Sequence, residues 1–114
     1  MTQSLKRVIL EMGTGNDLHG RDYTKAAKRA VQDALHHSSL SLFRSLGIDP
    51  NTMQIDLTLA AQKPEEIDLD AVASTLPYGT VTPRAVLGGL DVPDPATGDT
   101  CVIVNAGILV RLPL

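Results

Sequence analysis

The chain has 114 residues, 43% of them hydrophobic and 20% charged, which is typical of a single globular domain spanning residues 1–114. Ten basic and 13 acidic side chains give a formal net charge of −3, so we expect no nucleic-acid partner. No apolar run has the length of a membrane span, and residues 1–7 lack a signal-peptide core; we therefore expect a cytoplasmic protein without membrane contacts.

The first two predicted elements are a strand and a helix joined by a polar loop. A compact apolar run predicts a strand over Leu5–Met12, and the glycine-rich segment Gly13–Asp22 predicts a loop. Asp22 is a suitable N-cap for the helix that follows, which we expect to continue for some turns before it ends at Gly47. Small and apolar residues recur along this helix at helical spacing: Ala26, Ala27, Ala30, Val31, Ala34, Leu35, Leu42, Phe43 and Leu46.

The rest of the chain predicts three strands and a short helix. Residues Met53–Gln62 alternate as a half-buried strand does, and Asp68 begins a short helix with a stripe made by Leu69, Val72, Ala73 and Leu76. A strand over Thr80–Leu90 contains Pro83 and Gly88-Gly89, a turn-rich connection covers Val92–Thr100, and Cys101–Leu112 is the longest strand. The order β-α-β-α-β-β predicts an α+β two-layer sandwich, with a four-stranded mixed sheet and two helices on one face.

The aromatic content is only 3%, with no Trp, so small aliphatic side chains must fill the core. A domain of this size with such side chains buries little area by itself. The last strand directs Ile103, Asn105, Leu109 and Arg111 to the sheet face without helices. We therefore expect a homo-oligomer, with three copies as the expected number, in which these four residues are covered, whereas an isolated monomer exposes them.

The segment Gly13–Asp22 is the first candidate site. Glycines allow close backbone approach, the following helix start offers free N–H groups, and Arg21, Lys25 and Arg29 lie close by in sequence, which together favour a small polar or anionic ligand. A divalent ion held by Asp17, His19, Asp22 and Glu11 is a second interpretation. The third is a turn that these side chains merely stabilise, and the sequence leaves all three open.

Candidate residues elsewhere are few. His19 is the candidate general acid or base and Asp17 its orienting partner. Asn105 interrupts an aliphatic strand, so it either makes a structural hydrogen bond or lines a pocket between subunits with Arg84, Arg111 or Glu11. Cys101 is expected to pack and His36-His37 to be solvated, and we assign no metal and no cofactor. The candidate ligand-binding residues are Gly13, Gly15, Asp17, His19, Gly20, Arg21, Lys25, Arg29 and Asn105.

Several segments together resemble one family over nearly the whole chain: MGTGNDLHGRDYTKAAKRAVQDAL, LPYGTV, GGL and VIVNAGILVRLPL. This is the Lin family of conserved hypothetical proteins, named after a Listeria locus and of unknown function, so the resemblance implies domain limits and no reaction. The most specific part is DLHG followed by TKAA; Tyr23 departs from the proline that the resemblance leads us to expect at the first helical position.

The domain also looks, by fold-level analogy alone, like one repeat of the ring-opening amidohydrolases, cyanuric acid hydrolase and barbiturase. Those enzymes have active sites where repeats meet and use serine and lysine pairs. Gly88-Gly89-Leu90 offers no serine here, so that mechanism is not carried over.

The leading hypothesis is a homo-oligomer that binds a small polar or anionic ligand at residues 13–22 and the helix start; the alternative is a structural or regulatory subunit without a small-molecule site. Whether the protein is an enzyme stays open.

Overall fold

The computed structural model describes residues 5–36 and 45–113. In those ranges the chain forms five strands and two α-helices, which confirms the α+β class and adds one strand to the predicted four. Two short 3-10 turns, η1 (Pro50–Thr52) and η2 (Pro64–Glu66), flank the second strand. The helices and strands are β1 (Leu5–Asp17), α1 (Tyr23–His36), β2 (Gln54–Ala61), α3 (Leu69–Ala73), β3 (Thr80–Leu87), β4 (Leu90–Pro93) and β5 (Thr100–Pro113).

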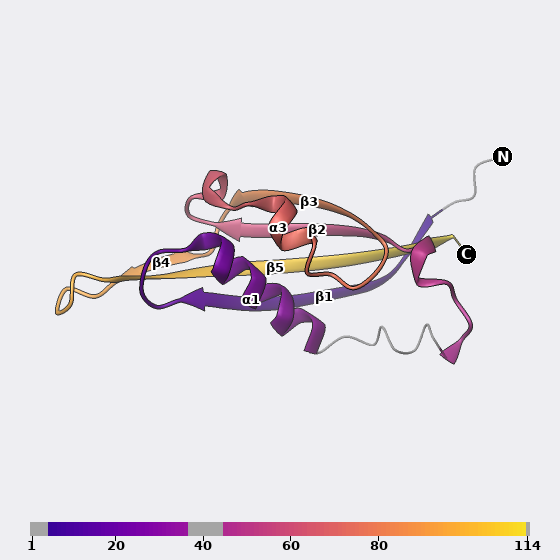
Figure 1. The fold of residues 1–114 in the computed structure, drawn as a ribbon, viewed down its shortest axis with the longest axis horizontal. Coiled ribbons are helices and arrows are strands. Elements are labelled where there is room, and N and C mark those ends of the chain that lie inside the picture. Colours follow the sequence, from indigo (N-terminus) through magenta and orange to yellow (C-terminus); the bar gives the residue numbers. More distant parts are fainter. Residues whose placement is uncertain (1–4, 37–44, 114) are drawn as a thin grey trace.

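The strands form one mixed sheet in the order β1-β5-β2-β3, with the short β4 also paired to β5 (Figure 1). β2 and β3 are parallel, whereas β5 is antiparallel to each of its neighbours. β5 lies at the centre because one of its edges pairs with β1 along almost its whole length and the other pairs with β2 and then β4. The long last strand that the alternation predicted therefore organises the sheet.

The predicted strand over Thr80–Leu90 is divided in two. The pair Gly88-Gly89 separates β3 from β4, and Gly89 adopts a positive φ of 60° that favours glycine. After this break the chain leaves β2 and pairs with β5, where Leu90 lies opposite Ile103. The strand count of four was wrong because the glycine pair that we placed inside one strand marks a change of partner strand.

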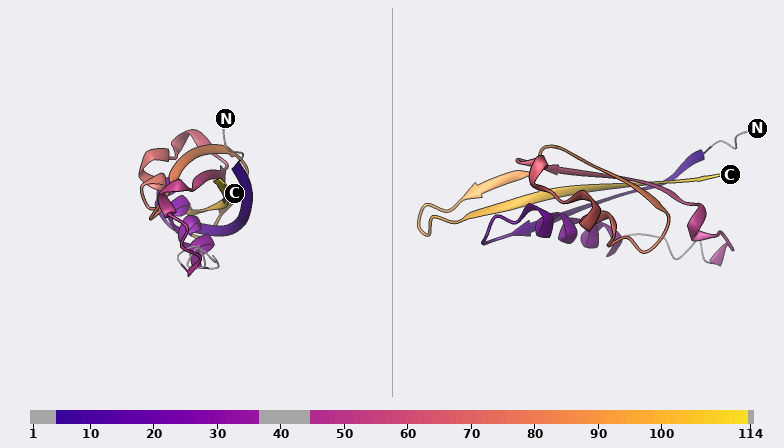
Figure 2. Two further views of the ribbon diagram at one scale, coloured as in Figure 1. Left: turned by 90° about the vertical axis from the view of Figure 1, so that its right-hand side faces the viewer. Right: turned by 45° about the horizontal axis from the view of Figure 1, so that its top comes forward.

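Both helices lie on one face of the sheet, as predicted, and the other face carries none in the described ranges (Figure 2, right). α1 packs over β1 and β5, and α3 over β3. The core between helices and sheet consists of small and aliphatic side chains, with Ile55, Leu57, Leu59, Val102, Val104 and Val110 at its centre. No helix in the described ranges is long and apolar enough to cross a membrane.

The predicted helix starts are confirmed by their caps. Asp22 Oδ1 accepts the N–H of Lys25 at 3.0 Å, and Asp68 Oδ1 accepts the N–H of Ala71 at 3.1 Å. The stripe of α1 is buried as expected from Ala26 to Ala34, and Tyr23 in its first turn is buried with it. Leu35 is half-buried and Leu46 is 63% exposed, so the expectation that the buried stripe reaches Leu46 was wrong. The predictions about His37, Leu42 and Phe43 lie outside the described residues.

The prediction of a loop over Gly13–Asp22 was partly wrong. β1 continues to Asp17, and only residues 18–22 connect it to α1. Gly13, Gly15 and Asp17 face the helix and are buried, whereas Thr14 and Asn16 between them are exposed. A Cβ on Gly13 would overlap the backbone of Ala30 and Ala34, and one on Gly15 would overlap that of Ala26 and Ala30. These glycines allow α1 to approach the strand closely.

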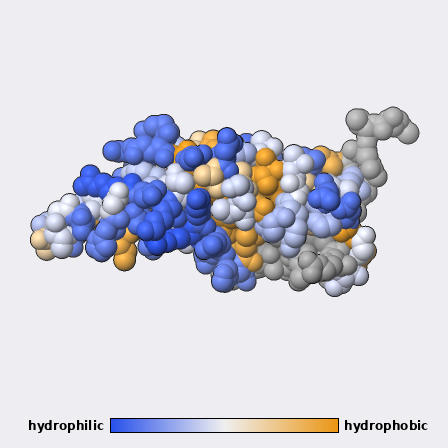
Figure 3. Space-filling model, in the orientation of Figure 1, coloured by the Kyte–Doolittle hydropathy of each residue, from blue (hydrophilic) through white to orange (hydrophobic). Residues whose placement is uncertain are grey.

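The sheet face without helices, here called the open face, differs from the helix face. Hydrophilic residues predominate around α1 in the view of Figure 3. The strand register instead places a set of exposed large apolar side chains on the open face: Leu10, Met12, Val86, Leu90 and Val92. Of the four residues expected to be exposed in a monomer, Asn105 is exposed and Ile103, Leu109 and Arg111 are half-buried.

Candidate functional site

The buried carboxylate of Asp17 lies where the sequence predicted an anion. Its side chain is 6% exposed, and its Oδ2 accepts the N–H of Asp22 at 2.9 Å, beside the start of α1. Its Oδ1 lies 4.0 Å from Lys25 Nζ and 3.8 Å from Arg29 Nη1. The helix start and its two basic side chains therefore already hold a negative group that the chain itself supplies.

Arg29 and Asp33 of α1 also bind the outer edge of β1. Arg29 Nη1 donates to the carbonyl oxygen of Asn16 at 2.7 Å, and the N–H of Thr14 donates to Asp33 Oδ2 at 2.9 Å. Both contacts satisfy backbone groups that an edge strand would otherwise leave to solvent. Arg29, which we assigned to a ligand from the sequence, thus connects α1 to β1.

His19 and Asp17 do not form the predicted pair. His19 Nδ1 lies 2.9 Å from Asp99 Oδ2 in the connection between β4 and β5, and its side chain is 78% exposed. The connection at residues 18–22 turns sharply there, with φ of 96° at Gly20 and 52° at Arg21. His19 therefore links two exposed loops, and the expectation that Asp17 orients it was wrong. In the described ranges no three His, Cys, Asp or Glu side chains gather as a metal site would require.

The sequence did not lead us to a buried contact between Tyr23 and Asp91. The Tyr23 hydroxyl donates to Asp91 Oδ2 at 2.5 Å, and Asp91 Oδ1 is buried with no hydrogen-bond partner among the described residues. Burial, followed by the hydrogen bond to Asp91, raises the pKa of Tyr23 from 10.0 to about 12. The contact fixes β4 to the first turn of α1, and it could not be predicted while β4 was unrecognised.

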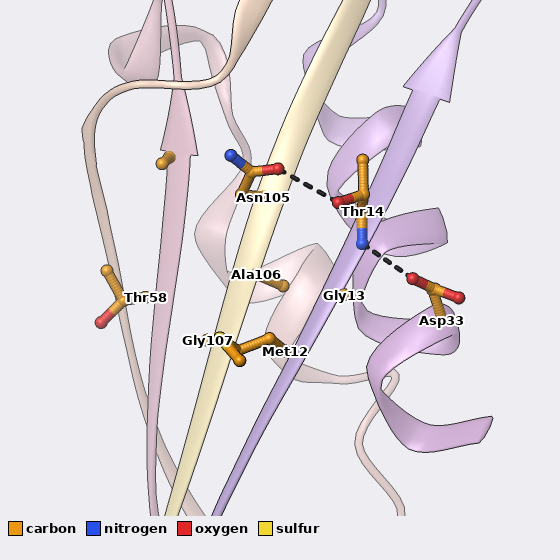
Figure 4. Close-up of a pocket in the computed structure, with 9 residues that line it drawn as sticks. Met12, Gly13, Thr14, Asp33, Thr58, Asn105, Ala106 and Gly107 are labelled. Carbon is orange, nitrogen blue, oxygen red and sulfur yellow. Dashed lines mark hydrogen bonds between the residues drawn. The ribbon is translucent and has the colours of Figure 1, made fainter. Parts of the chain in front are cut away.

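Asn105 lies on the opposite side of the sheet from this cluster, on the open face. Thr14 Oγ1 donates to Asn105 Oδ1 at 3.2 Å, and the Nδ2 amino group of the amide has no acceptor among the described residues. Figure 4 shows the amide oxygen directed to Thr14 and the nitrogen on the side of β2. The structure thus separates Asn105 from Asp17, His19 and Lys25, with which we had grouped it.

A hollow of about 510 Å³ surrounds this amide and is called the Asn105 hollow below. Its lining comes from three adjacent strands and, past the edge of β1, from Asp33 of α1. The strand residues are Met12, Thr14, Thr58, Ala60, Asn105, Ala106 and Gly107. Gly13 also lies at its margin. Two residues of the predicted ligand set, Gly13 and Asn105, therefore meet at one cavity, whereas Asp17, Lys25 and Arg29 meet at the start of α1. Ligand binding at either place stays a prediction.

The fold and these two clusters define a small α+β protein whose sheet, in the described ranges, is covered by helices on one face only. A family model described as a conserved hypothetical protein, the Lin0512 family, matches residues 7–110. The chain belongs to this family, which confirms the resemblance inferred from its DLHG and TKAA segments. No curated protein matches the chain.

A solved structure supports the same fold. The chain is similar to an FtsZ-like protein of unknown function from Nostoc punctiforme PCC 73102, known from its crystal structure. The two share 33% sequence identity, and the match covers 99% of this chain and 100% of that one with a TM-score of 0.84. The fold of the described residues is therefore similar to one known from experiment.

Proposed function

We propose that the protein is a homo-oligomer that binds a small polar molecule in the Asn105 hollow on the open face. The observation that carries this proposal is an exposed amide, whose Nδ2 group has no acceptor among the described residues, at a cavity of about 510 Å³ on the open face. Ligand sites usually have volumes of roughly 300–1,000 Å³ and combine an apolar lining with a few polar groups that fix orientation.

The oligomer is supported by the apolar margin of this hollow. Met12 is 71% exposed and Leu10 53% exposed at β1, and Val86, Leu90 and Val92 lie farther along the open face. A stable interface buries about 800 Å² on each partner, with apolar residues at its centre. A second copy is the occupant we propose, since most assemblies of soluble proteins repeat the same chain about a symmetry axis. Three copies remain the expected number.

The start of α1 supports an anionic ligand less well. A ligand there would compete with Asp17 for Lys25 and Arg29, because one internal carboxylate already lies within 4.0 Å of both cations. The alternative function is a structural or regulatory subunit without a small-molecule site. The exposed apolar residues beside the hollow favour it, because they indicate an interface and do not by themselves require a ligand. Separate experiments on the assembly and on the hollow distinguish the two functions.

Sedimentation velocity tests the assembly. The wild-type protein should sediment as a multiple of its 12.1 kDa chain, and Met12→Glu should shift it to the monomer by placing a charge in the covered face. Leu87→Glu is the matched control: Leu87 is 73% exposed, similar to Met12, but pairs in register with buried Ala61 and so points to the helix face. A wild-type monomer at micromolar concentration would contradict the oligomer.

Thermal unfolding with a panel of small acids, amides and amino acids tests the hollow. A compound that binds should raise the unfolding temperature of the wild type, and Asn105→Leu, which keeps the branching of the side chain but removes its polar atoms, should lose that increase. If no compound acts and the assembly still depends on Met12, the protein is a structural subunit and the ligand proposal is wrong.

A further inference from the structure

Gly107 lies on the open face where no packing reason explains a glycine. It occupies the middle of β5, between Met12 of β1 and Thr58 of β2 in a regular register. Its φ is not among the positive values, and a Cβ built on it would meet no atom within 4 Å. A glycine inside a strand weakens it and commonly marks a bulge, a bend or the close approach of a ligand or another backbone. The regular register at this position contains no bulge.

A second hollow, of about 230 Å³, adjoins the Asn105 hollow at this glycine. The two share Thr58 and Gly107 in their linings. The second hollow is also lined by Leu10 and Leu109 on its apolar side and by Asp56, Arg84 and Arg111 on its polar side. Because Gly107 has no side chain, the two hollows form one continuous groove, called the seat below. The seat runs from Asn105 at one end to Arg84 and Arg111 at the other.

The charges at the arginine end leave one cation without an acidic partner. Arg111 and Asp56 form an ion pair, which is neutral as a unit. Arg84 donates from Nε to Thr58 Oγ1 at 2.9 Å, and no ion pair among the described residues includes it. The Thr58 contact orients the guanidinium while leaving its two terminal nitrogens for a ligand. A planar guanidinium with two free N–H groups matches the two oxygens of a carboxylate.

We propose that the seat around Gly107 takes a small organic carboxylate, with its carboxylate on Arg84, its apolar chain over Gly107 between Met12 and Leu109, and an acceptor oxygen at Asn105 Nδ2. This inference deepens the proposed function and rests on it. One unpaired guanidinium balances one negative charge, which favours a carboxylate over a phosphate dianion.

The probe is 6-oxoheptanoate, which carries a carboxylate at one end and a ketone oxygen near the other. Titration of the ¹⁵N-labelled protein, in the assembly it forms, should move the resonances of the Gly107 amide and Arg84 Nε with saturation. The neutral 6-oxoheptanamide and the dianion propyl phosphate should each bind at least about tenfold more weakly, because neither provides a single carboxylate. Arg84→Gln should weaken binding of 6-oxoheptanoate to the same extent.

Two variants separate this site from a structural effect. Gly107→Val should abolish binding without lowering the unfolding temperature, because the new side chain enters empty space. Lys63→Gln removes one positive charge near α3 and should leave the affinity unchanged. Equal binding of the amide, tighter binding of propyl phosphate, or full binding by Arg84→Gln would overturn the carboxylate assignment and leave the Asn105 hollow intact. If the Gly107 resonance shows no saturable shift, the inference is overturned. A panel compound that raises the unfolding temperature of the wild type but not of Asn105→Leu would then still support the proposed function.

Discussion

The two faces of the sheet both carry glycines, and the glycines have opposite surroundings. Gly13 and Gly15 on the helix face lie against the backbone of α1, where no side chain would fit. Gly107 on the open face has free space where its side chain would be. The comparison teaches that a glycine in a strand has no single cause: α1 of the same chain requires Gly13 and Gly15, whereas no group of the described residues requires Gly107, where we propose a ligand.

The largest expected effect on stability comes from replacing a glycine by alanine on each of the two faces. Gly15→Ala places a methyl group into the backbone of Ala26 and Ala30, so the free energy of unfolding should fall by about 3 kcal/mol or more. Gly107→Ala meets no atom and lowers the entropy of the unfolded chain, so stability should rise by up to about 1 kcal/mol. Denaturant unfolding of both variants measures the difference. Similar losses in both would remove the distinction between the faces.

A smaller effect is expected at the edge of the helix face, where Tyr23→Phe removes the hydroxyl bound to Asp91. The variant leaves a carboxylate without a buried donor, so stability should fall by about 1–3 kcal/mol. The pKa of Tyr23 is higher in the folded state, about 12 against 10.0, so this contribution is fully present below pH 10 and is lost as pH rises towards 12.

Measuring the free energy of unfolding of wild type and Tyr23→Phe at several pH values tests that linkage. The difference between them should stay constant up to pH 10 and shrink between pH 10 and 12. Other groups titrate in the same range in both proteins, and taking the difference removes their contribution. A difference that does not change with pH would mean that folding does not raise the pKa of Tyr23.

The smallest effect is expected at the exposed connection that belongs to neither face. His19→Ala breaks the contact with Asp99, whose side chain is 48% exposed, and should lower stability by less than about 1 kcal/mol. Added salt should reduce even that loss, since exposed ion pairs are screened. Thermal unfolding at low and high salt measures it, and a loss comparable to that of Tyr23→Phe would show that the connection is more than a surface link.

The fold followed from the sequence wherever one strand face is buried and aliphatic. The alternation of apolar residues from Val102 to Leu112 predicted β5 correctly, and the capping residues Asp22 and Asp68 predicted both helix starts. The prediction failed at Gly13–Asp17, because glycines are rare in strands and the partner that requires them, the alanine stripe of α1, is distant in sequence. It failed again at Gly88-Gly89, where pairing passes from one strand to another.

The candidate site was predictable only in part for the same reason. Basic residues near a helix start do indicate a negative partner, but the sequence could not show that Asp17 takes this place from inside the fold. Asn105 was recognisable as an amide in an aliphatic strand. Its neighbours Thr14 and Thr58 come from other strands, so the hollow itself depends on a register that no local pattern specifies.

The central position of β5 also bears on how the chain acquires its structure. In the order of synthesis β5 is the last of the five strands, yet β1, β2 and β4 all pair with it. Until β5 has been made, only the parallel pair of β2 and β3 can form, and β1 has no neighbour in the sheet. Folding must therefore await contacts between segments nearly 100 residues apart, which slows it and leaves β1, with its exposed Leu10 and Met12, open to association with other nascent chains.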